Sequence, residues 1–179
     1  AGKWVAQEYL KDVDKNEELD VVLLIPPAGT SAKDRAEGFE EEICKVFPNA
    51  HTETFGKSSD RQDFMSTMED VLSSHSSLDL VFGYSAQAGM GAYAALTTAG
   101  KEVYVYGVDG APEAKKVIAK DNSIYRMTAA QSPITIGKEC YKAAKTLIAG
   151  EKPEEFEVDV PAFAIDSSNI DEYLDADWQ

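Results

Sequence analysis

Apolar and polar positions alternate along this chain with two different periods. Six short segments rich in β-branched and aromatic residues predict strands, and the apolar residues that recur every three or four positions between them predict helices. The expected strands are Leu19–Ile25, Ala50–Phe55, Leu78–Tyr84, Val103–Val108, Ile124–Ala130 and Phe156–Ile165. The expected helices are Gly2–Leu10, Ala32–Phe47, Arg61–Ser74, Ala88–Ala99, Pro112–Ala119 and Pro133–Ala149.

This alternation of strands and helices determines the fold class that we expect. It predicts an α/β fold, a three-layer doubly wound parallel sheet with helices on both faces. The 179 residues suit one compact domain, which we expect to span residues 1–165, followed by an acidic C-terminal tail over residues 166–179. Sheets of this kind bind ligands outside the carboxyl ends of their strands, so functional residues should directly follow each strand.

Charge excludes two classes of partner. The chain has 17 Lys and Arg residues against 32 Asp and Glu residues, which gives a net charge of −15. Binding to nucleic acid or to anionic lipid requires clustered basic side chains, so we expect neither partner. No apolar segment approaches the roughly 18 residues of a membrane-spanning helix.

One strand-to-helix segment resembles the turn that carries the catalytic serine of hydrolases. The run Gly83-Tyr84-Ser85-Ala86-Gln87 follows a predicted strand, but Gln87 stands where the second glycine of that motif is required. The histidine that activates such a serine follows it in the chain, whereas His51 and His75 both precede Ser85. We therefore expect no catalytic residue here.

The same segment contains a glycine pattern similar to that of dinucleotide-binding sites. In those sites the first glycine lies in the tight turn directly after the strand, where backbone meets the pyrophosphate. Here Gly89 and Gly91 fall inside the following helix, where small residues allow the helix to pack closely on the sheet. Neither histidine belongs to a ligand cluster, so we expect no cofactor and no metal site. A dinucleotide-dependent enzyme is one alternative.

The remaining polar groups follow the predicted strands, and their spacing carries a family resemblance. The pieces are A-G-T-S-A at residues 28–32, R-x-E-G-F at 35–39, G-x-D-G-x-P at 107–112 and Q-x-P-x-x-I-G at 131–137. At these residues the chain resembles the ribose-binding-protein-like periplasmic sugar-binding proteins, the type I periplasmic binding proteins. The resemblance extends from Gly2 to about Phe163.

The resemblance implies that this chain is one half of a larger architecture. Proteins of that family have two similar α/β lobes joined by three crossing strands, with the sugar in the cleft between them. The chain resembles the carboxyl-side lobe, and Phe156–Ile165 would then contain one of the crossings. We expect a missing amino-side lobe of the same protein as a partner, and a natural single-lobe sensor is the alternative.

Three residues match sugar-binding positions of that family. Arg35 corresponds to an arginine whose planar guanidinium donates two hydrogen bonds to neighbouring oxygens. Asp109 corresponds to an aspartate that accepts hydrogen bonds from two hydroxyls, although an aspartate before Gly110 also suits a turn. Gln131 corresponds to a glutamine that donates and accepts at once.

Two positions depart from the family pattern and put ribose itself in doubt. Ser59 stands where ribose binders have an aromatic residue, and Ser85 stands where they have an amide. Tyr84 or Gln87 could supply the lost contact. The predicted ligand site therefore consists of Arg35, Asp109, Gln131 and Tyr84, with Ser85 and Ser59 at its rim.

The resemblance also implies a function. We expect the protein to bind a monosaccharide or similar small polyol, without catalysis, as the substrate-binding component of an ABC-type uptake system. Its other partner would be the membrane permease of that transporter, and its location periplasmic or extracellular, with a lipid anchor in a Gram-positive source. The alternatives are the effector-sensing domain of a LacI-type sugar-responsive repressor and an extracytoplasmic sugar sensor for a kinase or chemoreceptor.

Overall fold

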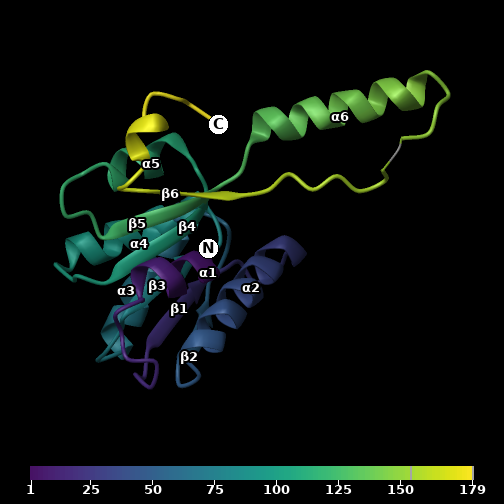
Figure 1. The fold of residues 1–179 in the computed structure, drawn as a ribbon. Coiled ribbons are helices and arrows are strands. Elements are labelled where there is room, and N and C mark those ends of the chain that lie inside the picture. The colour runs from purple at the N-terminus through teal and green to yellow at the C-terminus, as the bar shows by residue number, and fades with distance from the viewer. Residues whose placement is uncertain (154, 179) are drawn as a thin grey trace.

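A single six-stranded sheet forms the centre of the computed structural model, which describes residues 1–153 and 155–178 (Figure 1). The strand order is β2-β1-β3-β4-β5-β6. The strands are β1 (Asp20–Leu24), β2 (His51–Phe55), β3 (Leu80–Gly83), β4 (Tyr104–Asp109), β5 (Tyr125–Ala130) and β6 (Phe163–Asp166). Strands β1 to β5 are parallel, and β6 pairs antiparallel with β5.

Helices cover both faces of the sheet, as the alternating pattern predicted. One face carries α1 (Gly2–Trp4), the π-helix η1 (Val5–Tyr9) and α2 (Thr30–Val46), and the other carries α3 (Arg61–Ser74), α4 (Ala86–Thr98) and α5 (Pro112–Ile118). The remaining helices are α6 (Pro133–Ile148) and the 3-10 turn η2 (Ile170–Glu172). The expected three-layer α/β architecture is confirmed.

Strand β1 shows why the sheet has two cores. Successive side chains of a strand point to opposite faces, and β1 is apolar on both. Val21 and Leu23 pack in the core under α2, whereas Val22 and Leu24 pack in the core under α3 and α4. A continuous apolar segment of this kind is typical of a central parallel strand.

The first and last expected elements differ from the prediction. The segment Gly2–Leu10 begins as α-helix but continues as the π-helix η1. The segment Phe156–Ile165 forms a strand only in its last part, and Phe156 is exposed. The expectation of a wholly parallel sheet is wrong at β6, because the chain leaves the carboxyl edge after β5 and returns from that side.

Helix α6 does not cover the sheet. It projects away from the rest of the molecule, and none of its residues is buried (Figure 1). Its exposed large apolar side chains include Ile134, Tyr141 and Ile148, whose spacing of seven places them on one helix face. The helix therefore presents an apolar stripe that no described part of the chain contacts closely enough to bury.

The segment after β6 packs back on the body of the protein. Ile170 is buried, and the rings of Phe163 and Tyr173 lie 5.4 Å apart. Lys115 on α5 donates a hydrogen bond from Nζ to the carbonyl oxygen of Ala176 at 2.6 Å. Within the described residues, no helix is both long and apolar enough to cross a membrane.

Candidate ligand-binding site

Three of the predicted site residues meet at the carboxyl edge of the sheet. Asp109 is the last residue of β4, and Gln131 directly follows the neighbouring strand β5. Gln131 donates a hydrogen bond from Nε2 to Oδ1 of Asp109 at 2.8 Å. Arg35, on α2, approaches the same oxygen with its Nη1 at 3.3 Å. The structure thus brings Arg35, Asp109 and Gln131, hereafter the Asp109 cluster, into one place.

The backbone of Asp109 has an unusual conformation. Its φ is +91°, in the left-handed region that side chains other than glycine rarely adopt. Such strain costs on the order of 1–3 kcal/mol and is concentrated at functional sites. The hydrogen bonds from Gln131 and from the backbone of α4 hold the carboxylate in this position.

Tyr84 contributes through its backbone and Ser85 through a helix cap, rather than through the side-chain contacts with ligand that the sequence predicted. The carbonyl oxygen of Tyr84 accepts a hydrogen bond from Nη1 of Arg35 at 2.9 Å. The Ser85 hydroxyl caps α4 by accepting from the backbone N–H of Ala88 at 3.3 Å, and Ser85 is buried. The backbone N–H of Ala86 donates to Oδ2 of Asp109 at 3.0 Å, a backbone contact that sequence analysis could not assign.

Ser59 lies apart from this group. It is exposed in the loop between β2 and α3, and the described residues provide no hydrogen bond that joins it to the Asp109 cluster. The helix cap beside it is Asp60, whose carboxylate accepts from the backbone N–H of Gln62. Gln87, which could have replaced the lost ligand contact, has a partner within the protein: its side-chain oxygen accepts a hydrogen bond from Nε of Arg61 at 2.9 Å.

A hollow of about 360 Å³ adjoins the Asp109 cluster on the face covered by α2. Arg35 and Gln131 line one part of it, and Phe39, Phe82 and Val108 line another. The rings of Phe39 and Phe82 are stacked, with centroids 4.3 Å apart. Phe39 belongs to the R-x-E-G-F piece of the family pattern, although no role was predicted for it.

The floor beneath Asp109 is built from two glycines and a tyrosine. The Tyr125 side chain is fully buried, and its hydroxyl fills the space where a Cβ atom at Gly89 or Gly107 would lie. Burial raises the pKa of Tyr125, and the nearby charge of Asp109 raises it further. The expectation that small residues let α4 pack closely on the sheet is confirmed at Gly89, whereas Gly91 lies against Arg61 and Phe64 of α3.

The chemistry of this site suits a polar, uncharged ligand. The side chains of Arg35 and Asp109 carry opposite charges and remain 29% and 25% exposed, so they are ordered yet reachable from solvent. The guanidinium and amide N–H groups donate hydrogen bonds and the carboxylate accepts them. A ligand hydroxyl can therefore accept from the first two groups and donate to the third. Among the described residues, no group of His, Cys, Asp and Glu side chains is arranged to hold a metal ion.

The family model for the periplasmic binding protein domain matches residues 1–152, which is most of the chain. This chain belongs to the periplasmic binding protein family. The family is one of solute-binding proteins, and the fold is one lobe of the type I periplasmic-binding-protein architecture, as the motifs after the strands predicted.

Curated relatives of this periplasmic binding protein are ribose import binding proteins. RbsB of Salmonella typhimurium is 33% identical over 158 residues, which cover 85% of this chain and 49% of that protein. RbsB of Bacillus subtilis is 29% identical over 129 residues, which cover 70% of this chain and 40% of that protein. The chain therefore spans about half the length, or less, of these relatives.

Solved structures agree with this assignment. An ABC transporter solute-binding protein from Mycobacterium smegmatis with bound glycerol has a TM-score of 0.84 and 25% identity, over 99% of this chain and 62% of its own. One from Agrobacterium vitis bound with α-D-tagatopyranose has a TM-score of 0.82 and 20% identity, over 96% of this chain and 57% of its own, and shows the shared fold.

Proposed function

We propose that this protein binds a small sugar or related polyol, without changing it chemically, as the substrate-binding component of an ABC-type uptake system. The observation that carries the proposal is the Asp109 cluster, an ordered set of one acceptor and two donors at the carboxyl edge of the sheet. Family membership supports it, since the curated relatives are ribose import proteins and the solved neighbours include proteins with bound sugars and polyols.

The ligand in this proposal is a monosaccharide or polyol other than ribose, or one held differently from ribose. Arg35, Asp109 and Gln131 bind its hydroxyls, and the backbone of Tyr84 keeps Arg35 in place. Ser85 contributes mainly as the cap of α4, and Ser59 lies farther out on the rim. Phe39 and Phe82 border the hollow but are each only 1% exposed, so in this proposal the second lobe supplies the aromatic contact that is lost at Ser59.

A second lobe of the same protein completes the site in this proposal. The apolar stripe of α6 supports it, because Ile134, Tyr141 and Ile148 would be covered when the helix packs on that lobe. Residues 1–165 then form the lobe together with its crossings, and the acidic segment 166–179 is its C-terminal tail, held through Lys115. The ligand shifts a hinge equilibrium between open and closed forms, and the closed form docks on the membrane permease.

The protein acts outside the cytoplasmic membrane in this proposal, in the periplasm or, with a lipid anchor, on the surface of a Gram-positive cell.

The test of ligand binding is a thermal-shift screen of monosaccharides and polyols on the two-lobed protein, followed by calorimetry. A ligand at about a hundred times its dissociation constant raises the free energy of unfolding by about 2.7 kcal/mol. Failure of every compound to stabilise the protein would contradict sugar binding, and failure of the permease to import the bound compound would favour a sensor or repressor domain.

A further inference from the structure

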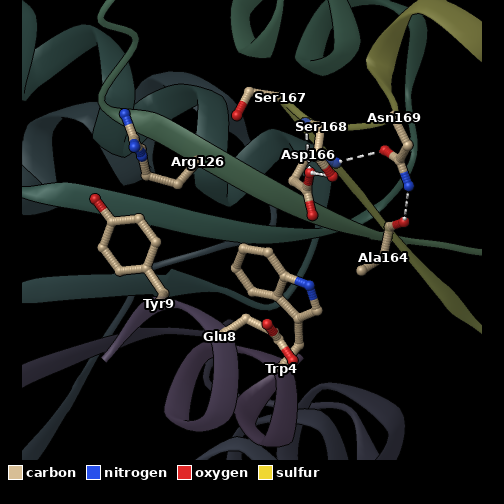
Figure 2. Close-up of a pocket in the computed structure, with 9 residues that line it drawn as sticks. All are labelled: Trp4, Glu8, Tyr9, Arg126, Ala164, Asp166, Ser167, Ser168 and Asn169. Atoms are coloured by element: carbon tan, nitrogen blue, oxygen red, sulfur yellow. Dashed lines mark hydrogen bonds between the residues drawn. The ribbon is translucent and has the colours of Figure 1, made fainter. Parts of the chain in front are cut away.

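A second hollow lies at the opposite edge of the sheet from the Asp109 cluster. It has a volume of about 520 Å³, which is within the range of small-molecule sites. Its walls come from three separate segments: Trp4 and Glu8 on the first helical turns, Arg126 at the start of β5, and the turn that begins at Asp166. Figure 2 shows the Trp4 indole in the middle, with Tyr9 and Arg126 to one side and Asp166 above it.

One wall of this hollow is aromatic and ordered. The rings of Trp4 and Tyr9 lie 6.4 Å apart at an angle of 23°, and Tyr9 packs edge-on against the buried ring of Tyr106. The guanidinium carbon of Arg126 lies 5.1 Å from the centre of the Tyr9 ring and 5.2 Å from that of Tyr104. These contacts fix both the ring faces and the positive charge before any ligand arrives.

The opposite wall carries a buried carboxylate held in a rigid turn. Asp166 is 8% exposed, and its Oδ1 accepts hydrogen bonds from the backbone N–H and the hydroxyl of Ser168 at 2.7 and 2.5 Å. Asn169 locks the turn by accepting from the backbone N–H of Asp166 and donating to the carbonyl of Ala164. The second oxygen of Asp166 accepts no hydrogen bond from the described residues, and Figure 2 shows it directed toward the Trp4 side.

We propose that this hollow, the Trp4 site, binds a small polyhydroxylated molecule that carries no negative charge. The carboxylates of Glu8 and Asp166 repel an anion, and the positive charge of Arg126 offsets only one of the two. A hydroxyl group both donates and accepts, so a polyol meets the carboxylate acceptors and the guanidinium and indole donors together. Its C–H groups can lie on the indole face, which contributes apolar contact.

The Trp4 site is independent of the proposed function. It lies at the amino end of β5, whereas the Asp109 cluster lies at the carboxyl end of the same strand. None of its groups is one of the residues that meet at Asp109. The proposal therefore predicts a polyol interaction that is confined to this lobe and needs no second lobe.

Fluorescence of Trp4 provides the test. The chain has two tryptophans, so Trp178→Phe leaves Trp4 as the single emitter. This protein is titrated with D-glucose, D-ribose and myo-inositol as neutral probes, and with gluconate as an anionic probe. We expect a saturable change of Trp4 emission with at least one neutral probe, at a dissociation constant about tenfold or more below that of gluconate.

Variants separate binding at the Trp4 site from binding elsewhere on the lobe. Asp166→Asn and Glu8→Gln should each weaken the response about tenfold, because each removes a charged acceptor. Glu8 is exposed, so its variant does not threaten folding, and Glu17→Gln on an exposed loop is the matched control. The proposal is overturned if no neutral probe gives a saturable response, if neither variant weakens it, or if Arg35→Lys abolishes it, which would assign the signal to the Asp109 cluster.

Discussion

Gln131 and Asp109 lie at the ends of neighbouring strands, and the Gln131 amide donates to the Asp109 carboxylate at 2.8 Å. The bond joins two groups of the same lobe. The acceptor at the centre of the candidate site is therefore oriented by the protein itself, which reduces the ordering that a ligand must impose. Arg35 completes this arrangement from the other side.

Replacing Arg35 by lysine should weaken sugar binding by about tenfold or more in the two-lobed protein. Lysine keeps the charge but cannot form the planar pair of hydrogen bonds, and a tenfold change corresponds to about 1.4 kcal/mol. Calorimetric titration measures the effect. An unchanged dissociation constant would place the ligand elsewhere, and the melting temperature of the ligand-free variant serves as the control for folding.

Helix α6 should exchange its amide hydrogens quickly in this chain and slowly in the two-lobed protein. A helix of 16 residues without tertiary contacts is marginally stable in water, and none of the residues of α6 is buried. Helix α4, whose Ala88, Ala92 and Leu96 are buried, should be protected in both proteins. Equal protection of α6 and α4 in the single lobe would contradict the proposed role of the apolar stripe.

Alanine at Gly107 should destabilise the fold by about 1–3 kcal/mol, because its methyl group overlaps the Tyr125 hydroxyl. Adding Tyr125→Phe removes that oxygen and should recover part of the loss. Gly38→Ala is the matched control, since a Cβ there meets no atom within 4 Å and glycine is a poor residue within a helix. Denaturant unfolding of the wild type and these variants measures the differences, and an equal effect at both glycines would refute the packing argument.

His75 should make the fold more stable in mildly acidic solution. Its Nδ1 lies 3.0 Å from the Val71 carbonyl oxygen and its Nε2 lies 3.1 Å from Glu53, and these hydrogen bonds raise the pKa of His75. A raised pKa contributes stability that is present below the unfolded value and is lost as the pH rises through the folded value. The charge of Asp20 adds to this rise in the pKa.

The measurement compares wild type with His75→Gln by thermal unfolding between about pH 5.5 and pH 8. The advantage of the wild type should shrink as the pH rises, by a degree or two in melting temperature, because the group is close to solvent and its interactions are screened. A difference that stays constant across this range would show that the charge of His75 does not contribute.

The sequence predicted the fold well where local signals agreed. Strand β1 is apolar from Val21 to Leu24 because both faces are covered, and α3 begins at Arg61 because Asp60 caps it. The pattern also predicted the helix α6, but not that it leaves the sheet uncovered, nor that β6 pairs antiparallel with β5, because both outcomes depend on what the element packs against. A stripe such as Ile134, Tyr141 and Ile148 predicts that a helix is covered, but it does not say by which part of a protein.

The candidate site was also predictable in part: the sequence indicated which residues meet, but not how each side chain is used. Arg35, Asp109 and Gln131 each follow a different strand or open a helix beside one, so topology alone brings them to one edge. The sequence could not reveal that Ser85 uses its hydroxyl as a cap, nor that Trp4 faces Asp166 across a hollow. The latter depends on how β6 returns to the sheet, which no local pattern determines.

The two cysteines lie on parts of the fold that can move relative to one another, so labels attached to them can measure that movement. Cys44 is half-buried on α2, which stays with the sheet, and Cys140 is exposed on the projecting helix α6. Burial raises the pKa of the Cys44 thiol, so Cys140 should react first with a thiol-specific label. Two different spectroscopic probes can therefore be attached in sequence to the natural protein, and the distance between them would report how α6 moves relative to the sheet.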